Sequence, residues 1–200
     1  MMLASVTTAY QIQKKILLGK VIGCYKVGAS NYSSGKFFGT DEIIVGGIES
    51  KNIFFSKIRK DYSIAELELV VKIRVSNDIE CGYEILNQYL GIECPIIEVD
   101  NPHGDMTLCI ADNCSSGDLI ILDEYDGDYD EKLAIFVNDV EVTKGDFDSL
   151  RFPVKKIICK TLSIIENNSL PLGKEIYIAT GGLTATFPLN NKDQLRVHFE

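Results

Sequence analysis

The segment from Ala65 to Ile73 alternates between two kinds of position, which is the strongest structural pattern in the chain. Successive side chains of a β-strand point to opposite faces of a sheet, so this pattern predicts a strand with two different faces. One face is entirely aliphatic and carries Leu67, Leu69, Val71 and Ile73. The other face carries Glu66, Glu68, Val70 and Lys72.

Glu66 and Glu68 repel each other on this shared face unless water, a proton or a cation separates their carboxylates. A face open to water is the simpler interpretation, because glutamate is rarely buried. On an enclosed face, a hard divalent cation would be the natural partner of the two carboxylates. The pair alone favours the solvated face, so the rest of the chain must decide between the two interpretations.

The composition bounds the class of protein. Two hundred residues, 46% hydrophobic and 24% charged, fit one globular domain over residues 1–200. A net charge of −9 without a basic cluster argues against nucleic acid or an anionic membrane as the main partner. The chain has neither an apolar run long enough to span a membrane nor a signal-peptide pattern at its N-terminus.

The six cysteines include no Cys-x-x-Cys pair, and the chain has two histidines. A zinc ribbon is therefore not expected. Reduced thiols in a cytoplasmic protein are the simplest interpretation of the cysteines.

The remaining patterns predict helices and strands in one chain. Helices are expected over 7–18, 81–90 and 153–166, where apolar residues recur at helical spacing. Strands are expected over 21–28, 65–73, 95–100, 119–122, 133–137, 140–142, 175–179 and 195–199. Residues 29–39 are expected to form a loop, 40–56 short strands and turns, and 180–184 a break after a strand.

Five motifs, taken in order, resemble one known family. They are Ala9-Tyr10-Gln11-Ile12-Gln13, the strand from Gly23 to Gly28 around Lys26, Glu66-Leu67-Glu68, the hairpin from Phe136 to Val142, and the segment from Leu170 to Thr184. Together with the helix after Pro153, they resemble the fumarylacetoacetate hydrolase superfamily. The resemblance is greatest to its branch of 2-keto-4-pentenoate hydratases and 4-oxalocrotonate decarboxylases.

The resemblance implies an α+β fold, namely a mixed, mainly antiparallel β-roll with flanking helices. It also implies a Mg²⁺ or Mn²⁺ ion held by three carboxylates, which would be those of Glu66, Glu68 and Glu98. Lys26 and Glu68 would be catalytic. The implied substrate-binding residues are Lys26, Ser30, Thr180, Gly181 and Gly182.

The implied activity is that of a metal-dependent lyase on a small 2-oxo or 2-hydroxydienoic acid. Three carboxylates leave three octahedral positions of the ion open, and a 2-oxo acid can fill two of them. The ion would then stabilise a chelated enolate as a Lewis acid. Relatives are commonly oligomeric, so a homo-oligomer is expected, with the small 2-oxo acid as the only other partner.

The chain also departs from the family pattern. It has few residues before the first motif, Ile43-Ile44-Val45-Gly46 in place of an Asp-Phe-Gly-like step, and Asp100-Asn101-Pro102 in place of Asp-Ser-Arg. The missing groups assist proton transfer and orientation in the hydratases, so the sequence does not separate hydratase from decarboxylase.

Two further functions stay open at this point. One is a C–C hydrolase or keto–enol tautomerase of the same superfamily, which the absence of a histidine near the motifs makes less favoured. The other is a degenerate, non-catalytic relative that serves as a subunit or binding module. Plain structural interpretations also remain: Lys26 as a surface lysine, Glu98 as a solvated side chain, and Thr180 to Gly182 as an ordinary turn. His103 and His198 are expected at the surface.

Overall fold

A computed structural model describes residues 5–76, 82–101 and 103–200. Its main sheet has the strand order β2-β1-β9-β4-β5-β6-β3, with β10 paired to β4. The neighbouring strands are antiparallel except for the β1–β9 and β3–β6 pairs. The strands are β1 (Ile22–Gly28), β2 (Ile44–Glu49), β3 (Ile53–Phe55), β4 (Tyr62–Val75), β5 (Tyr83–Cys94), β6 (Asp118–Glu124), β9 (Glu175–Gly182) and β10 (Phe187–Leu189).

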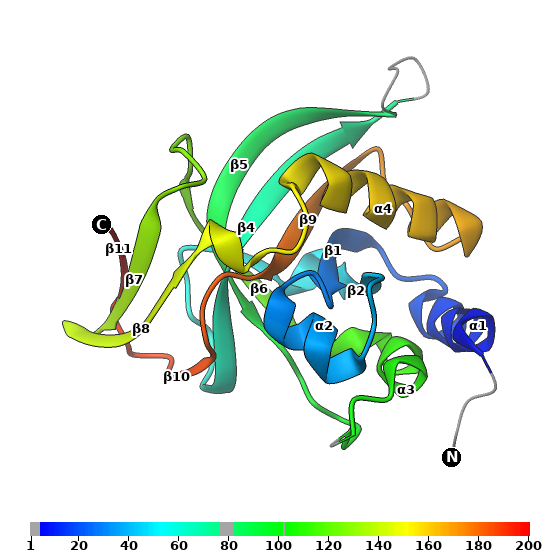
Figure 1. The fold of residues 1–200 in the computed structure, drawn as a ribbon, viewed down its shortest axis with the longest axis horizontal. Coiled ribbons are helices and arrows are strands. Elements are labelled where there is room, and N and C mark those ends of the chain that lie inside the picture. The colour runs from blue at the N-terminus through cyan, green and yellow to red at the C-terminus, as the bar shows by residue number, and fades with distance from the viewer. Residues whose placement is uncertain (1–4, 77–81, 102) are drawn as a thin grey trace.

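Among the described residues, a second, antiparallel sheet and four α-helices flank this curled sheet (Figure 1). The second sheet has the order β11-β7-β8 and consists of β7 (Lys132–Val137), β8 (Val140–Asp146) and β11 (Leu195–Phe199). The helices are α1 (Val6–Leu17), α2 (Tyr32–Phe38), α3 (Met106–Ala111) and α4 (Val154–Asn167). Helix α4 packs on β1, β2 and β9, whereas α1 packs on α3 at the end away from the second sheet. The expected α+β architecture, a mainly antiparallel curled sheet with flanking helices, is confirmed.

Strand β4 has the two faces that its alternation predicts. Its aliphatic residues Leu67, Leu69, Val71 and Ile73 are fully buried in the main hydrophobic core. Val70 belongs instead to a smaller apolar cluster on the opposite face, together with Cys24 and Ile121. Glu66 and Glu68 share that opposite face with Val70, so their carboxylates stand where the smaller cluster ends.

The helices α1 and α4 confirm two of the three expected helices. Helix α1 begins after Ser5, whose hydroxyl accepts a hydrogen bond from the Thr8 backbone N–H. Helix α4 buries an apolar stripe that includes Ile157, Ile158 and Ile165.

The third expected helix, over 81–90, is wrong, although Cys81 itself lies outside the described residues. The segment from Tyr83 onward is strand β5, which pairs with β4 along its length. Its apolar residues fit a helical spacing equally well, and the long antiparallel partner decides in favour of a strand.

The strand expected over 95–100 is also wrong, because these residues follow the end of β5 in irregular structure. Conversely, strand β9 continues to Gly182, through the break expected after Ala179. Helices α2 and α3 lie where no helix was expected; their caps, Asn31 and Asp105, accept backbone hydrogen bonds that stabilise these short segments.

The described cysteines are all free thiols, as expected. Cys24, Cys94 and Cys114 are buried. None of the helices in the described part of the chain has the length and apolar character that crossing a membrane requires.

Candidate active site

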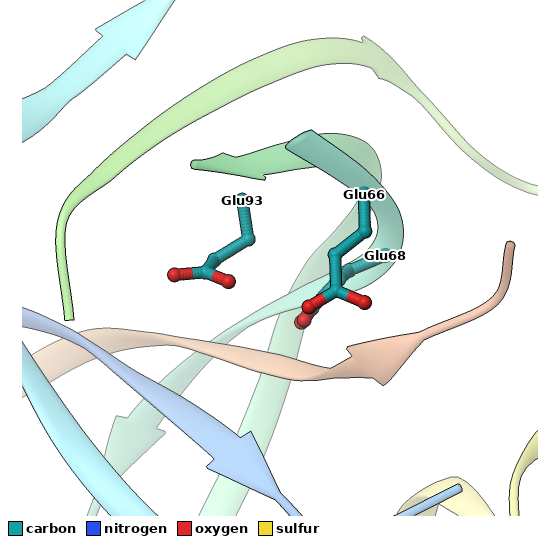
Figure 2. Close-up of side chains that lie close together, drawn as sticks. All are labelled: Glu66, Glu68 and Glu93. Atoms are coloured by element: carbon teal, nitrogen blue, oxygen red, sulfur yellow. The ribbon is translucent and has the colours of Figure 1, made fainter. Parts of the chain in front are cut away.

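Three carboxylates converge at one end of the main sheet. Glu66 and Glu68 come from β4, and Glu93 comes from the adjacent strand β5. Glu93 lies directly opposite Glu66 in the antiparallel register, which places their side chains on the same face. One carboxylate oxygen from each of the three residues lies within 4.8 Å of the others, and Figure 2 shows the carboxylates turned toward a common space.

This group of three carboxylates is withdrawn from water. Glu68 is 1% exposed and Glu93 is 0% exposed, whereas Glu66 is partly exposed. Burial raises the pKa of all three carboxyl groups, and that of Glu93 reaches about 7. Repulsion from Glu66 and Glu93 adds to the rise of the Glu68 pKa. The site therefore holds more negative charge than the protein alone stabilises.

Lys26 brings the one ammonium group of this cluster. Its Nζ donates a hydrogen bond to Glu93 Oε2 at 3.0 Å, and the residue is buried. Burial lowers the pKa of Lys26, but the attraction of Glu93, Glu66 and Glu68 outweighs burial and leaves the pKa above its ordinary value. Lys26 therefore remains protonated at neutral pH.

The contact between Lys26 and Glu93 depends on the curl of the sheet. Strand β1 is three places away from β5 in the strand order. In a flat sheet that separation is about 14 Å. Because the sheet curls, the two side chains meet across its concave face and form a buried ion pair.

The end of β9 closes the site beside Glu68 and Glu66. The backbone N–H of Gly181 donates to Glu68 Oε2 at 2.9 Å, which fixes that carboxylate. Gly181 has φ +114°, and a Cβ there would lie 1.8 Å from Ser30 Oγ. A Cβ on Gly182 would lie 2.2 Å from Glu66 Oε2. Glycine at both positions lets the backbone approach the carboxylates.

A cavity of about 380 Å³, here called the site cavity, opens onto these groups. Lys26, Glu66, Glu68 and Gly182 are among its lining residues. Much of the remaining lining is apolar and includes Phe37, Phe38, Ile44, Ile64 and Ile97. A small pocket with apolar walls and a few convergent charged groups is typical of a small-molecule site.

The other expected substrate-binding groups form bonds within the protein. The Thr180 hydroxyl donates to the Leu69 carbonyl oxygen at 3.0 Å, and the Ser30 hydroxyl donates to the Val27 carbonyl oxygen at 3.2 Å. Both residues are buried, and neither lines the site cavity. Ser30, Thr180 and Gly181 thus support the walls of the cavity, while substrate contact by Lys26 and Gly182 stays a prediction.

The structure corrects the expected third carboxylate. Glu98 is exposed, follows the end of β5, and lies near Asp112 rather than beside Glu66 and Glu68. The residue that joins the pair is Glu93. The error follows from the strand boundary, because a strand over 95–100 would have carried Glu98, whereas the strand that pairs with β4 ends at Cys94.

Glu93 does have a signal in the sequence. It is a single charge in the otherwise uncharged segment from Leu90 to Ile97, as Lys26 is in its own strand. A charged residue inside an apolar strand needs a buried partner. Lys26 and Glu93 are that pair.

Comparison with solved structures shows what this fold resembles. 4-Oxalocrotonate decarboxylase from Pseudomonas putida G7, complexed with magnesium and adipate, matches with a TM-score of 0.78 and 17% identity. The match covers 98% of this chain and 82% of that one. No family model matches the chain, and no curated protein matches it in sequence.

Two other structures extend the likeness. A protein provisionally assigned to the fumarylacetoacetate hydrolase family, from Yersinia pestis CO92, matches over 90% of this chain and 89% of its own, with 16% identity and a TM-score of 0.59. Maleylpyruvate hydrolase from Sphingobium sp. SYK-6 matches over 89% of this chain and 66% of its own, with 10% identity and a TM-score of 0.58. At the level of the fold, the resemblance to the fumarylacetoacetate hydrolase superfamily is confirmed.

Proposed function

We propose that this protein is a divalent-metal-dependent lyase that acts on a small 2-oxo or 2-hydroxydienoic acid, as a hydratase or a decarboxylase. The observation that carries the proposal is the convergence of Glu66, Glu68 and Glu93 beside Lys26, at the wall of a cavity of small-molecule size. The same fold occurs in a 4-oxalocrotonate decarboxylase that binds magnesium.

The three carboxylates fit a Mg²⁺ or Mn²⁺ ion. Glu93 Oε1 is buried and has no hydrogen-bond partner among the described residues, so one oxygen of the group still lacks a donor or a cation. Three ionised carboxylates and one ammonium carry a net charge of −2, which one divalent ion neutralises. Hard oxygen ligands of this kind favour Mg²⁺ or Mn²⁺ over softer metals.

A divalent ion held by Glu66, Glu68 and Glu93 would supply Lewis acidity, stabilising negative charge on the 2-oxo group of the substrate. Residues of the chain would position the substrate and the metal-binding carboxylates. Lys26 holds a proton at Nζ close to these carboxylates, so it can place positive charge and a hydrogen-bond donor beside the substrate. The Gly181 N–H keeps Glu68 in place, and the absence of a side chain on Gly182 keeps space free beside Glu66.

Hydrolysis is the less favoured chemistry for this cavity. A C–C hydrolase needs a base that activates water, and histidine is the usual choice. Both histidines of the chain, His103 and His198, are exposed, and neither lines the site cavity. No histidine therefore stands beside the carboxylates.

Three measurements test the proposal. Protein dialysed against Mg²⁺ or Mn²⁺ and then desalted is analysed for bound metal, and we expect about one ion per chain. Loss of the ultraviolet absorbance of a 2-hydroxydienoate, with formation of the hydrated 4-hydroxy-2-oxo acid and without release of carbon dioxide, would identify a hydratase. Release of carbon dioxide from a 2-oxo acid that can lose its distal carboxylate would identify a decarboxylase.

Matched variants tie these activities to the site. Lys26→Met should abolish turnover, whereas Lys51→Met should not, because the Lys51 side chain is 72% exposed and contacts Glu49 away from the cavity. Absence of bound metal, together with no turnover of either substrate, would contradict the proposal and favour a non-catalytic binding module. Cleavage into two acids would indicate a hydrolase instead.

A further inference from the structure

A second cavity of about 270 Å³, here called the distal lobe, adjoins the site cavity. The two share lining residues, namely Phe37, Phe38, Ile97, Cys109 and Ser115. A molecule whose head lay at Glu66 and Glu68, and whose chain ran along Phe37 and Phe38, would reach the distal lobe. The lining of this lobe decides what that chain can carry.

The distal lobe is apolar with two acidic side chains. Val99 and Leu108 add to the apolar surface of the shared phenylalanines, and the charged residues of the lobe are Asp100 and Asp112. Burial and the nearby charge of Glu98 raise the pKa of Asp112 above its ordinary value. No lysine, arginine or histidine is among the described residues that line the lobe. An anionic group placed here would meet the negative charge of Asp100 and Asp112 without a cation beside it.

A chain that extended in the opposite direction, past Glu66 and Gly182, would meet one lysine, which already has carboxylate partners. A larger cavity of about 740 Å³ adjoins the site cavity at Asn31, Glu66 and Gly182, and its single lining cation within the described chain is Lys144. Lys144 Nζ already lies 2.6 Å from Glu200 Oε1 and 3.5 Å from Glu141 Oε2. Lys26, the cation of the site cavity, is held by Glu93. Each lysine that lines these connected cavities is thus already paired with a carboxylate.

We propose that the substrate is a monoanionic 2-oxo acid, whose single carboxylate belongs to the metal-binding head and whose remaining carbon chain is uncharged and packs on Phe37, Phe38 and Ile97. This inference rests on the proposed function, because it assumes that the head binds at the three carboxylates. It goes beyond that function by excluding substrates with a second, distal carboxylate, and it therefore favours the hydratase over a decarboxylase that removes such a carboxylate. The discrimination comes from the apolar surface and from the negative charge of Asp100 and Asp112 together.

The test compares two ligands of equal chain length on the Mg²⁺-loaded protein by isothermal titration calorimetry. 2-Oxohexanoate carries one carboxylate, and 2-oxoadipate carries a second one at its far end. We expect the dissociation constant of 2-oxohexanoate to be at least tenfold lower. Oxalate, which has the chelating head without any chain, reports separately on the head site.

Variants locate the discrimination in the distal lobe. Asp112→Lys should tighten 2-oxoadipate binding about tenfold and leave oxalate binding unchanged. Asp126→Lys makes the same charge change at an exposed aspartate outside these cavities and should alter neither. If Asp112→Lys fails to fold, the affinities of the wild-type protein for 2-oxohexanoate and 2-oxoadipate still test whether a distal carboxylate weakens binding.

The outcomes distinguish the two proposals. If oxalate does not bind the Mg²⁺-loaded protein, the proposed function and this inference both fall. If oxalate binds and 2-oxoadipate binds as tightly as 2-oxohexanoate or more tightly, the inference about substrate charge is overturned and the proposed function stands. Preference for 2-oxohexanoate that Asp112→Lys diminishes supports the inference.

Discussion

The metal-free protein should lose stability as the pH rises from 5 to 8, because its three site carboxyl groups have raised pKa values. In the folded state Glu93 titrates at about 7, compared with its ordinary value near 4.5. Between pH 4.5 and pH 7, the folded state therefore binds more protons than the unfolded chain does. Unfolding therefore becomes more favourable as the pH rises through this range.

The magnitude follows from the size of the pKa change. One pKa unit corresponds to about 1.4 kcal/mol, so the shift of Glu93 alone lowers the free energy of unfolding by roughly 3 kcal/mol between pH 5 and pH 8. The raised pKa values of Glu66 and Glu68 act in the same direction. With a urea m-value of about 2–3 kcal/mol/M, the midpoint should fall by roughly 1 M.

Urea unfolding followed by circular dichroism measures this effect in chelator at pH 5 and pH 8. Mg²⁺ at about 100 times its dissociation constant should restore about 2.7 kcal/mol at pH 8. At pH 5, protons compete for the same oxygens, so Mg²⁺ should stabilise the protein much less. Glu93→Gln removes the contribution of this one carboxyl group and should reduce the pH dependence of the metal-free protein.

Stability of the metal-free protein that does not fall between pH 5 and pH 8 would contradict this prediction. If the metal-free protein is equally stable or more stable at pH 8, the three carboxylates do not share an enclosed, repulsive site. Glu98→Gln serves as the control, since Glu98 is exposed and its removal should leave the pH dependence unchanged.

Two further substitutions test the surroundings of the carboxylates. Gly182→Ala would place a Cβ 2.2 Å from Glu66 Oε2, so the Glu66 carboxylate must move. The affinity for Mg²⁺, measured by calorimetry, should therefore fall at least tenfold. The midpoint of thermal unfolding should change little. Unaltered affinity would show that the position of Glu66 does not matter for the metal. Lys26→Met leaves Glu93 buried without its partner and should destabilise the metal-free protein by about 3 kcal/mol at neutral pH, measured by urea unfolding. Stability equal to that of the wild type would mean that the buried ion pair contributes nothing.

The sequence was sufficient to predict most of the architecture. The alternation around Glu66 and Glu68 correctly predicted which residues of β4 enter the main core. The periodicity of α4 and the hairpin of β7 and β8 were also recognisable, because local patterns and turn chemistry determine these elements. The short helices α2 and α3 were not predicted, since seven and six residues carry too little periodicity.

The candidate site was less accessible from the sequence. The Glu66–Glu68 pair was recognised because two residues in one strand share a face. Glu93 was not, because its position depends on the register of β5 against β4 and on where β5 ends. The contact of Lys26 with Glu93 depends further on the curl of the whole sheet, which no local pattern reports.

We propose that Glu93, rather than Glu98, completes the carboxylate group that binds the divalent ion. Calorimetric titration of Mn²⁺ into the wild type, Glu93→Gln and Glu98→Gln at pH 7.5 tests it directly. Glu93→Gln should weaken Mn²⁺ binding at least tenfold, and Glu98→Gln should keep the wild-type affinity within about twofold. Loss of Mn²⁺ binding in Glu98→Gln with normal binding in Glu93→Gln would contradict the account.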